Sequence, residues 1–316
     1  LTDFLYVWLI MKSVAFYHFP RVVAGTNRFL LFNPILKKRY KNRPEERVRL
    51  KWVEYILHQT QWKKSRIGFE TPVKVPQEKN TLRADLILYT EGMEPSVLIE
   101  CKSDSLKLNQ SAAEQAARYN SDIKAKYIVL TNGIEDYWFK KDDGDVRLTN
   151  HIFEEDSSFT EKEKDLDYWQ KRGFCSSRTD SNIADWLESA LNNFWQSDVG
   201  GTLRYLDFKK TVLSVPMNQY YKVFEMNSGR RLAVSFIGFG RSDNYIIAVL
   251  NSQGANQGIL TVNLDKLQDQ QRGSMMLMKG NKKKVDVTGR RLTIDLTNFD
   301  AKQIKNLPHS FMKFFV

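Results

Sequence analysis

Two apolar segments separated by a short polar loop constrain the fold of this chain most strongly. Residues 82–89 (LRADLILY) and 96–102 (SVLIECK) have the length and composition of β-strands, and the loop between them contains Gly92. We therefore predict an antiparallel hairpin. If its turn centres on Gly92 and the residue after it, Asp85 faces Glu100 across the hairpin.

The predicted register brings two carboxylates close together. Opposed residues of an antiparallel pair lie about 4.5–5.5 Å apart at Cα, and like charges there repel unless a cation lies between them. Asp85 and Glu100 therefore predict a divalent-cation site, and Lys102 lies on the strand face of Glu100, roughly 6.6 Å along the strand. Hydrolysis of a phosphodiester needs carboxylates, a metal-activated water and a nearby cation. The alternative is an ordinary surface hairpin with ion pairs, since a bare D…ExK pattern is weak.

The segments around the hairpin predict an α/β sandwich with a mixed sheet. Pro44, the two acids after it and an apolar repeat of 3.6 residues predict a helix from residue 44 to about 58. Further strands are expected at 69–75, 127–131 and 134–140, with a helix at about 106–121 and a two-residue turn at Asn132 and Gly133.

Two polar residues share one stripe of the second predicted helix. Gln115 and Tyr119 lie one turn apart on the face that should pack against the sheet. Gln115 is either a satisfied core amide or a group that reaches the carboxylates.

The few cysteines and histidines limit the kind of metal site. Cys101 and Cys175 are far apart in the sequence, and the four histidines are scattered. Any catalytic metal should therefore be held by carboxylates, which favours Mg²⁺ or Mn²⁺ over Zn²⁺. The lack of a disulfide framework favours a reducing cytoplasm.

The apolar segment 4–11 is too short to span a bilayer and lacks the basic region of a signal peptide. We expect no membrane association. The segment is either a packed strand or an extended start with Met11 as the initiator, and we assign residues 1–10 no function.

Positive charge is concentrated towards both ends of the chain, whose net charge is +11. Residues 200–316 carry 18 Lys and Arg against 8 Asp and Glu, and residues 1–60 carry 11 against 4. Residues 151–199 are acidic, and the stretch 158–196 within them has helical spacing. Such asymmetry fits a polyanionic partner, although solvated lysines alone would also explain it.

The texture of the sequence changes after about residue 202 to short β-type runs separated by turns, among them 221–226, 232–237, 245–250, 259–264, 275–278 and 292–296. We predict a β domain of the barrel or sandwich type. Lys282, Lys283 and Lys284 at a predicted hairpin tip either contact a nucleic-acid backbone or keep a β-edge soluble.

The candidate residues occur in an ordered pattern: Asp85, then Ile99-Glu100-Cys101-Lys102, then Gln115-Ala-Ala-Arg-Tyr119. This pattern resembles the PD-(D/E)xK nuclease superfamily, in particular the N-terminal nuclease domain of type I restriction enzyme R subunits and the RecB-type nucleases. Pro44-Glu45-Glu46, Arg83-Ala84-Asp85, Arg118-Tyr119-Asn120 and Leu130-Thr131-Asn132-Gly133 extend the resemblance over about residues 40–140. Ala84 stands where many members of the superfamily have proline.

The resemblance implies that Asp85 and Glu100 bind Mg²⁺, that Lys102 is catalytic, and that Gln115 and Tyr119 support the site or contact DNA. It further implies a glutamate from the first helix, for which Glu45 is the first choice and Glu46 the second. A homodimer is compatible with it. The sequence contains no GxxxxGK[ST] phosphate loop, so we expect no ATP motor of the kind that a translocating R subunit needs.

The sequence as a whole predicts a PD-(D/E)xK restriction-endonuclease-like mixed-sheet core followed by a mostly β C-terminal domain. The expected segments are an N-terminal extension (1–40), a nuclease-like domain (41–145), a helical connector (146–200) and a basic all-β domain (201–316). The expected function is Mg²⁺-dependent hydrolysis of DNA in restriction, defence or repair. The alternatives are a non-catalytic nucleic-acid-binding or accessory protein that retains the nuclease fold, and an interaction protein that binds another protein through its β domain.

Overall fold

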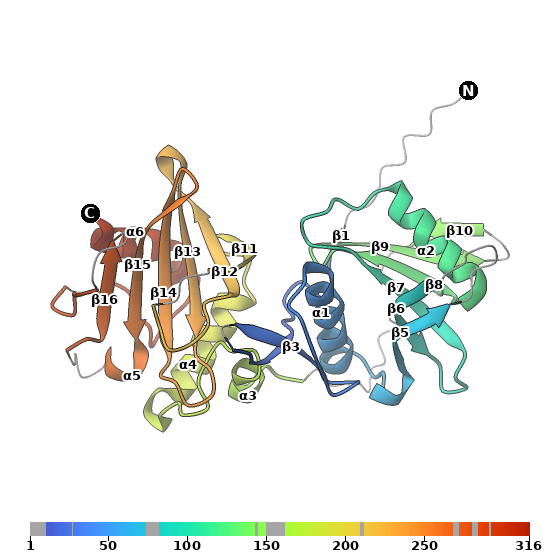
Figure 1. Ribbon diagram of the computed structural model, residues 1–316, viewed down its shortest axis with the longest axis horizontal. Coiled ribbons are helices and arrows are strands. Elements are labelled where there is room, and N and C mark those ends of the chain that lie inside the picture. Colours follow the sequence, from blue (N-terminus) through green and yellow to red (C-terminus); the bar gives the residue numbers. More distant parts are fainter. Residues whose placement is uncertain are drawn as a thin grey trace. The chain divides into compact units, whose positions relative to one another are not determined.

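A computed structural model describes residues 11–26, 28–73, 82–142, 145–149, 162–208, 212–267, 272–279, 284–290 and 292–316. The chain divides into two units (Figure 1). The first comprises residues 1–21 and 30–163, and the second comprises residues 22–29 and 164–316. The prediction for residues 1–10 lies outside the described residues.

A mixed sheet forms the centre of the first unit, with seven strands in the part that the structure describes. Its order is β1-β9-β8-β7-β6-β5, and β10 pairs with β9. The strands are β1 (Met11–Lys12), β5 (Ile67–Val73), β6 (Leu82–Tyr89), β7 (Pro95–Cys101), β8 (Tyr127–Thr131), β9 (Glu135–Asp142) and β10 (Asp145–Leu148). β7 and β8 are parallel and the other pairs are antiparallel, so the predicted mixed sheet is confirmed.

The β6–β7 hairpin has the register predicted from the sequence. Leu86 pairs with Ile99 and Leu88 pairs with Val97, and the register shifts only at Tyr89, next to the turn. Both strands are apolar on both faces and fully buried at their centres, as expected for inner strands of a covered sheet.

The helices of the first unit contact opposite faces of this sheet. In α1 (Pro44–Gln59), Trp52 donates its indole N–H to Thr131 Oγ1 at 3.0 Å. In α2 (Gln110–Ile123), Tyr119 packs in a cluster with Leu98 and Ile87. Thr131 pairs with Cys101 of β7, so the side chains of these two residues share one face of the sheet. Leu98 lies an odd number of residues from Cys101, so its side chain lies on the other face. The α1 contact and the α2 contact are therefore on opposite faces. The sheet is therefore the middle layer of a three-layer sandwich.

Local chemistry sets the ends of these helices. Pro44 is at the first position of α1, where its missing N–H costs no hydrogen bond. Asn109 caps α2 by accepting from Ala112 N at 3.0 Å, so the helix starts four residues later than the predicted residue 106. Lys124 ends it in the left-handed region at φ 62°.

The turn between β8 and β9 is longer than predicted. Thr131 pairs with Asp136, so four residues lie between the last paired residues rather than the two predicted. Asn132 closes this loop by accepting from the backbone N–H groups of Ile134 and Glu135. The Asn-Gly pair therefore acts through an Asn side-chain turn and not through a type I′ turn.

Short elements complete the chain around residues 21–66: β2 (Arg21–Ala24), β3 (Phe29–Asn33), β4 (Lys38–Tyr40) and the 3-10 turn η1 (Lys64–Arg66). β3 and β4 are antiparallel neighbours. Residues 22–29 belong to the second unit, where Val22 N donates to Lys171 O and Phe29 N donates to Asn218 Oδ1.

The second unit contains an antiparallel sheet whose strands follow one another in chain order in the described residues. They are β11 (Thr202–Leu206), β12 (Gln219–Glu225), β13 (Arg230–Ile237), β14 (Tyr245–Ser252), β15 (Ala255–Asn263), β16 (Met275–Lys279) and β17 (Val285–Asp286). Its helices are α3 (Leu166–Gln170), α4 (Ser181–Trp195), α5 (Leu264–Leu267) and α6 (Ala301–Phe315), with the 3-10 turn η2 (Asn227–Gly229). The predicted change to a mostly β region is confirmed.

Two details at the C-terminal end differ from the prediction. Residues 292–296, expected to be a strand, form no regular secondary structure. Residues 301–315 form α6, which the sequence reading missed, so this region is not all β. Asp300 caps this helix, and Ile304, Leu307 and Phe311 are buried at helical spacing. Pro308 inside the helix obscured the pattern, because proline in a helix interior is unfavourable.

Candidate active site in the first unit

Asp85 and Glu100 lie on the adjacent strands β6 and β7, each directly next to a residue of the Leu86–Ile99 pair. Both are buried, with 9% and 4% of their surface exposed. Asp85 Oδ2 accepts from the backbone N–H of Cys101 at 2.7 Å, which ties this carboxylate to the strand that carries Glu100. Burial of two carboxylates this close requires cationic neighbours.

Lys102 supplies one of these cations. It follows the end of β7, and its Nζ lies 2.9 Å from Glu100 Oε1 and 2.8 Å from Gln115 Oε1. Gln115 Nε2 in turn donates to the Tyr119 hydroxyl at 2.8 Å. The structure thus links these side chains in one hydrogen-bonded row from β7 to α2, and the amide of Gln115 reaches the site.

Arg49 of α1 supplies the second cation. Its Nη2 lies 2.6 Å from Asp85 Oδ1, and its Nη1 lies 2.8 Å from Glu46 Oε2 and 3.3 Å from Glu70 Oε1. Glu70 stands on β5 with φ 48°, in the left-handed region that a strand residue rarely adopts. Arg49 and Glu70 were missed by the sequence reading. The sequence does place Arg49 four residues after Glu45, on the buried side of the predicted helix, and this position could have indicated its role.

The two first-helix glutamates have different surroundings. Glu46 is buried at 8% exposure beside Arg49, whereas Glu45 is exposed. Glu45 still acts at a distance, because its charge helps to raise the pKa of Lys102. The structure therefore brings Glu46, the second choice, to the Arg49–Asp85 pair.

Burial shifts the protonation of the acids. It raises the pKa of Glu100 to about 7, with a further contribution from the Asp85 charge. Burial likewise raises the pKa of Glu46 to about 7, and it raises the pKa of Asp85 although Arg49 opposes the shift. For Lys102, burial lowers the pKa but the Glu100 carboxylate outweighs it, so the pKa is raised and the ammonium stays charged.

Two carboxylate oxygens in this cluster are buried without a hydrogen-bond partner, Glu46 Oε1 and Glu100 Oε2. An unsatisfied buried oxygen is costly, and it is an available ligand for a hard cation. The donor set of Asp85 and Glu100 thus suits Mg²⁺ or Mn²⁺ with water completing the shell. In the described ranges, no group of three or more His, Cys, Asp or Glu side chains has the spacing of a ready metal site.

The basic tip predicted in the C-terminal region is only partly described. Lys284 donates to the backbone oxygen of Val212, so it is held against its own unit. Lys282 and Lys283 lie outside the described residues. Cys101 and Cys175 are buried and free.

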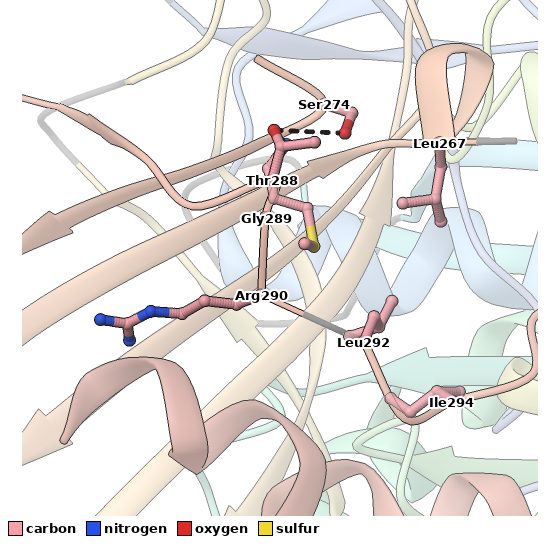
Figure 2. A pocket seen from close by; sticks show the side chains of 8 residues that line it. Leu267, Ser274, Thr288, Gly289, Arg290, Leu292 and Ile294 are labelled. Carbon is pink, nitrogen blue, oxygen red and sulfur yellow. Dashed lines mark hydrogen bonds between the residues drawn. The ribbon is translucent and has the colours of Figure 1, made fainter. Parts of the chain in front are cut away.

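A pocket in the second unit offers no comparable chemistry (Figure 2). It is lined by Leu267, Ser274, Met275, Thr288, Gly289, Arg290, Leu292 and Ile294. Its lining has hydroxyls and a guanidinium but no carboxylate, imidazole or thiol, and Arg290 extends away from the apolar side chains. This pocket therefore lacks the carboxylates and imidazoles that a hydrolytic site uses.

A known protein family matches the part of the chain that carries the Asp85–Glu100–Lys102 cluster. Residues 44–152 match the family model described as type I restriction enzyme R protein N terminus. The matched stretch includes every residue of the Asp85–Glu100–Lys102 cluster and Arg49, and it confirms the resemblance predicted from the sequence. No curated protein and no solved structure matches the chain. Among the described residues, no helix has the length and apolar character needed to cross a membrane.

Proposed function

We propose that the first unit is a Mg²⁺-dependent nuclease with a PD-(D/E)xK core that hydrolyses DNA phosphodiester bonds. The observation that carries the proposal is the convergence of Asp85, Glu100 and Lys102 at adjacent strands, with an unpartnered buried oxygen on Glu100. The match of residues 44–152 to a restriction-enzyme family supports the same activity.

Each residue has a definite task in this proposal. Asp85 and Glu100 hold the metal ion, which when bound polarises the phosphoryl group and lowers the pKa of a water. Lys102 Nζ, kept charged by Glu100, stabilises the negative charge that develops on phosphorus oxygens. Gln115 orients the ammonium by accepting from it, and Tyr119 fixes the amide of Gln115 in that orientation.

The biological setting that fits this activity is restriction, defence or repair in the cytoplasm. The basic character of residues 200–316 supports DNA as the partner, since phosphate contacts use Lys and Arg. Binding that weakens steeply between about 50 and 200 mM salt is the expected signature.

The test is cleavage of plasmid, single-stranded and branched DNA by the purified full chain with Mg²⁺ or Mn²⁺. Glu100→Gln and Lys102→Ala should each reduce the rate by about a thousandfold or more, because each removes a group that acts in the transition state. A folded wild-type chain that cuts none of these substrates would refute the proposal, as would cleavage that both substitutions leave unchanged.

One observation favours the alternative, a non-catalytic nucleic-acid-binding or accessory protein with a nuclease fold. Arg49 already neutralises Asp85 at 2.6 Å, so a metal ion is not the only cation that can satisfy this acid. Metal titration separates the two functions. A binding-only protein should show no thermal shift with Mg²⁺ and should gain stability from Asp85→Asn only if Arg49 is neutralised with it.

A further inference from the structure

Arg49 pairs with Asp85, one of the two proposed metal ligands, and also with Glu46 and Glu70. Its Nη2 contacts Asp85 Oδ1 at 2.6 Å, while Asp85 Oδ2 is held by the N–H of Cys101. Both oxygens of this proposed ligand are therefore engaged before any metal arrives. The guanidinium is itself well buried, with 11% of its side-chain surface exposed, so solvent screens the pair weakly.

A guanidinium and a divalent cation on the same carboxylate repel each other. Two like charges about 4 Å apart in a partly buried site repel each other by several RT, even at an effective dielectric constant of about 20. Because the guanidinium cannot lose its proton in this pH range, deprotonation offers no relief. Binding of a metal ion to Asp85 therefore weakens the Arg49–Asp85 pair.

The structure also provides a place for the displaced guanidinium. Its other nitrogen, Nη1, contacts Glu46 Oε2 and Glu70 Oε1, and Glu46 Oε1 is buried with no partner. This oxygen is an acceptor that the guanidinium can use once it leaves Asp85. Phe69, whose ring lies 5.3 Å from the Arg49 guanidinium carbon, supports the side chain during such a movement.

We propose that Arg49 is an internal counter-ion that competes with the divalent cation for Asp85. When the metal ion binds, Arg49 leaves Asp85 and stays paired with Glu46 and Glu70. This inference rests on the proposed nuclease function, because it assumes that Asp85 is a metal ligand. It makes Arg49 a positioning residue that sets the metal concentration at which the site loads. Glu46 and Glu70 act through Arg49 and not as metal ligands.

The experiment measures Mn²⁺ binding to the full chain by calorimetry and by electron paramagnetic resonance. Arg49→Met removes the competing charge while keeping much of the side-chain volume, and it should tighten Mn²⁺ binding by about tenfold or more. Arg49→Lys keeps the charge but cannot contact Asp85 and Glu46 through two separate nitrogens. Its affinity for Mn²⁺ should therefore lie between those of the wild type and Arg49→Met. A purely structural role for Arg49 would predict the opposite, a loss of affinity as the site distorts.

Arg47→Met is the matched control. Arg47 lies two residues away on α1 and pairs with Asp104 at 3.8 Å and with Asn42 at 3.0 Å. Its substitution changes the net charge by the same amount, so Mn²⁺ affinity should change by less than about twofold if the Arg49 effect is local. An equal gain in both variants would overturn the inference in favour of a general charge effect.

The two proposals fail in different ways. Equal or weaker Mn²⁺ binding by both Arg49 variants, with cleavage by the wild type, overturns the counter-ion role and leaves the nuclease intact. No Mn²⁺ binding by any variant, together with no cleavage, overturns both. If Arg49→Met does not fold without metal, Arg49→Lys carries the test, because its retained charge still neutralises the acids.

Discussion

In the first unit, the buried charges include five carboxylates in the described residues, Glu46, Glu54, Asp85, Glu100 and Asp136, whereas the described residues of the second unit bury no carboxylate. The second unit buries cations instead. Lys222 Nζ donates to the backbone oxygens of Ser197 and Val199 at 2.7 and 2.8 Å, and Arg172 donates to Tyr168 O at 2.7 Å.

The difference separates structural charge from functional charge. A buried lysine bound to carbonyl oxygens uses those donors within the fold, so they are not available to a ligand. Glu100 and Glu46 each retain an oxygen without a partner, so this part of the first unit can accept a further cation. The following predictions test that distinction, from the largest expected effect to the smallest.

Substitution of Glu100 should have the largest effect on cleavage. Glu100→Gln preserves the shape of the side chain but removes the charge that holds a metal ion, so cleavage should fall by about a thousandfold or more while the fold persists. The readouts are the cleavage rate and circular dichroism. A comparable loss of cleavage with Lys222→Met would contradict the separation of the two units' roles.

Lys222→Met should act on stability alone. It leaves two buried carbonyl oxygens without their charged donor, which costs about 1–3 kcal/mol of unfolding free energy for each unsatisfied group. Urea denaturation measures the loss. Unchanged stability would mean that water or a neighbour replaces the ammonium.

The stability of the metal-free protein should depend on pH through the buried carboxyl groups of the first unit. The pKa values of Glu100 and Glu46 are raised to about 7 in the fold from 4.5, so the folded state holds protons that the unfolded state releases between these values. Their stabilising contribution is complete below about pH 4.5 and is lost as the pH rises through 7, by about 1–3 kcal/mol for each carboxyl. Thermal melts in chelator between pH 5 and 8 measure it.

Metal should reverse this trend, because a cation binds the ionised carboxylates that protonation removes. With saturating Mg²⁺, the midpoint temperature should rise rather than fall between pH 6 and 8. Glu100→Gln should reduce the slope of both curves, and in chelator the contribution of Glu46 should remain. The same fall with and without Mg²⁺ would argue against metal binding at Glu100.

The smallest effects concern the helix caps. Asn109→Ala in α2 and Asp300→Ala in α6 should each cost about 1 kcal/mol, since each side chain accepts from a backbone N–H of its first turn. Only Asn109→Ala should also slow cleavage, by a few fold, because α2 carries Gln115 to Lys102. Equal slowing by both variants would indicate a general loss of stability.

The site could be predicted from the sequence as far as local pattern reaches. Strand alternation and hairpin register put Asp85, Glu100 and Lys102 together, and helical spacing put Gln115 and Tyr119 on one stripe. These relations depend on neighbours within one hairpin or one helix. The metal requirement, the choice of DNA and the homodimer stay predictions.

Contacts between elements that are distant in the chain could not be predicted from the sequence. Arg49, Glu46 and Glu70 come from α1 and β5, and their meeting with Asp85 depends on how the helix packs on the sheet. The placement of residues 22–29 in the second unit has no local signal either. The chain by itself determined the paired acids of the hairpin, because backbone periodicity is a short-range property. Tertiary structure alone decided that Arg49 of α1 pairs with Asp85, because long-range packing selects the residues that share a buried site.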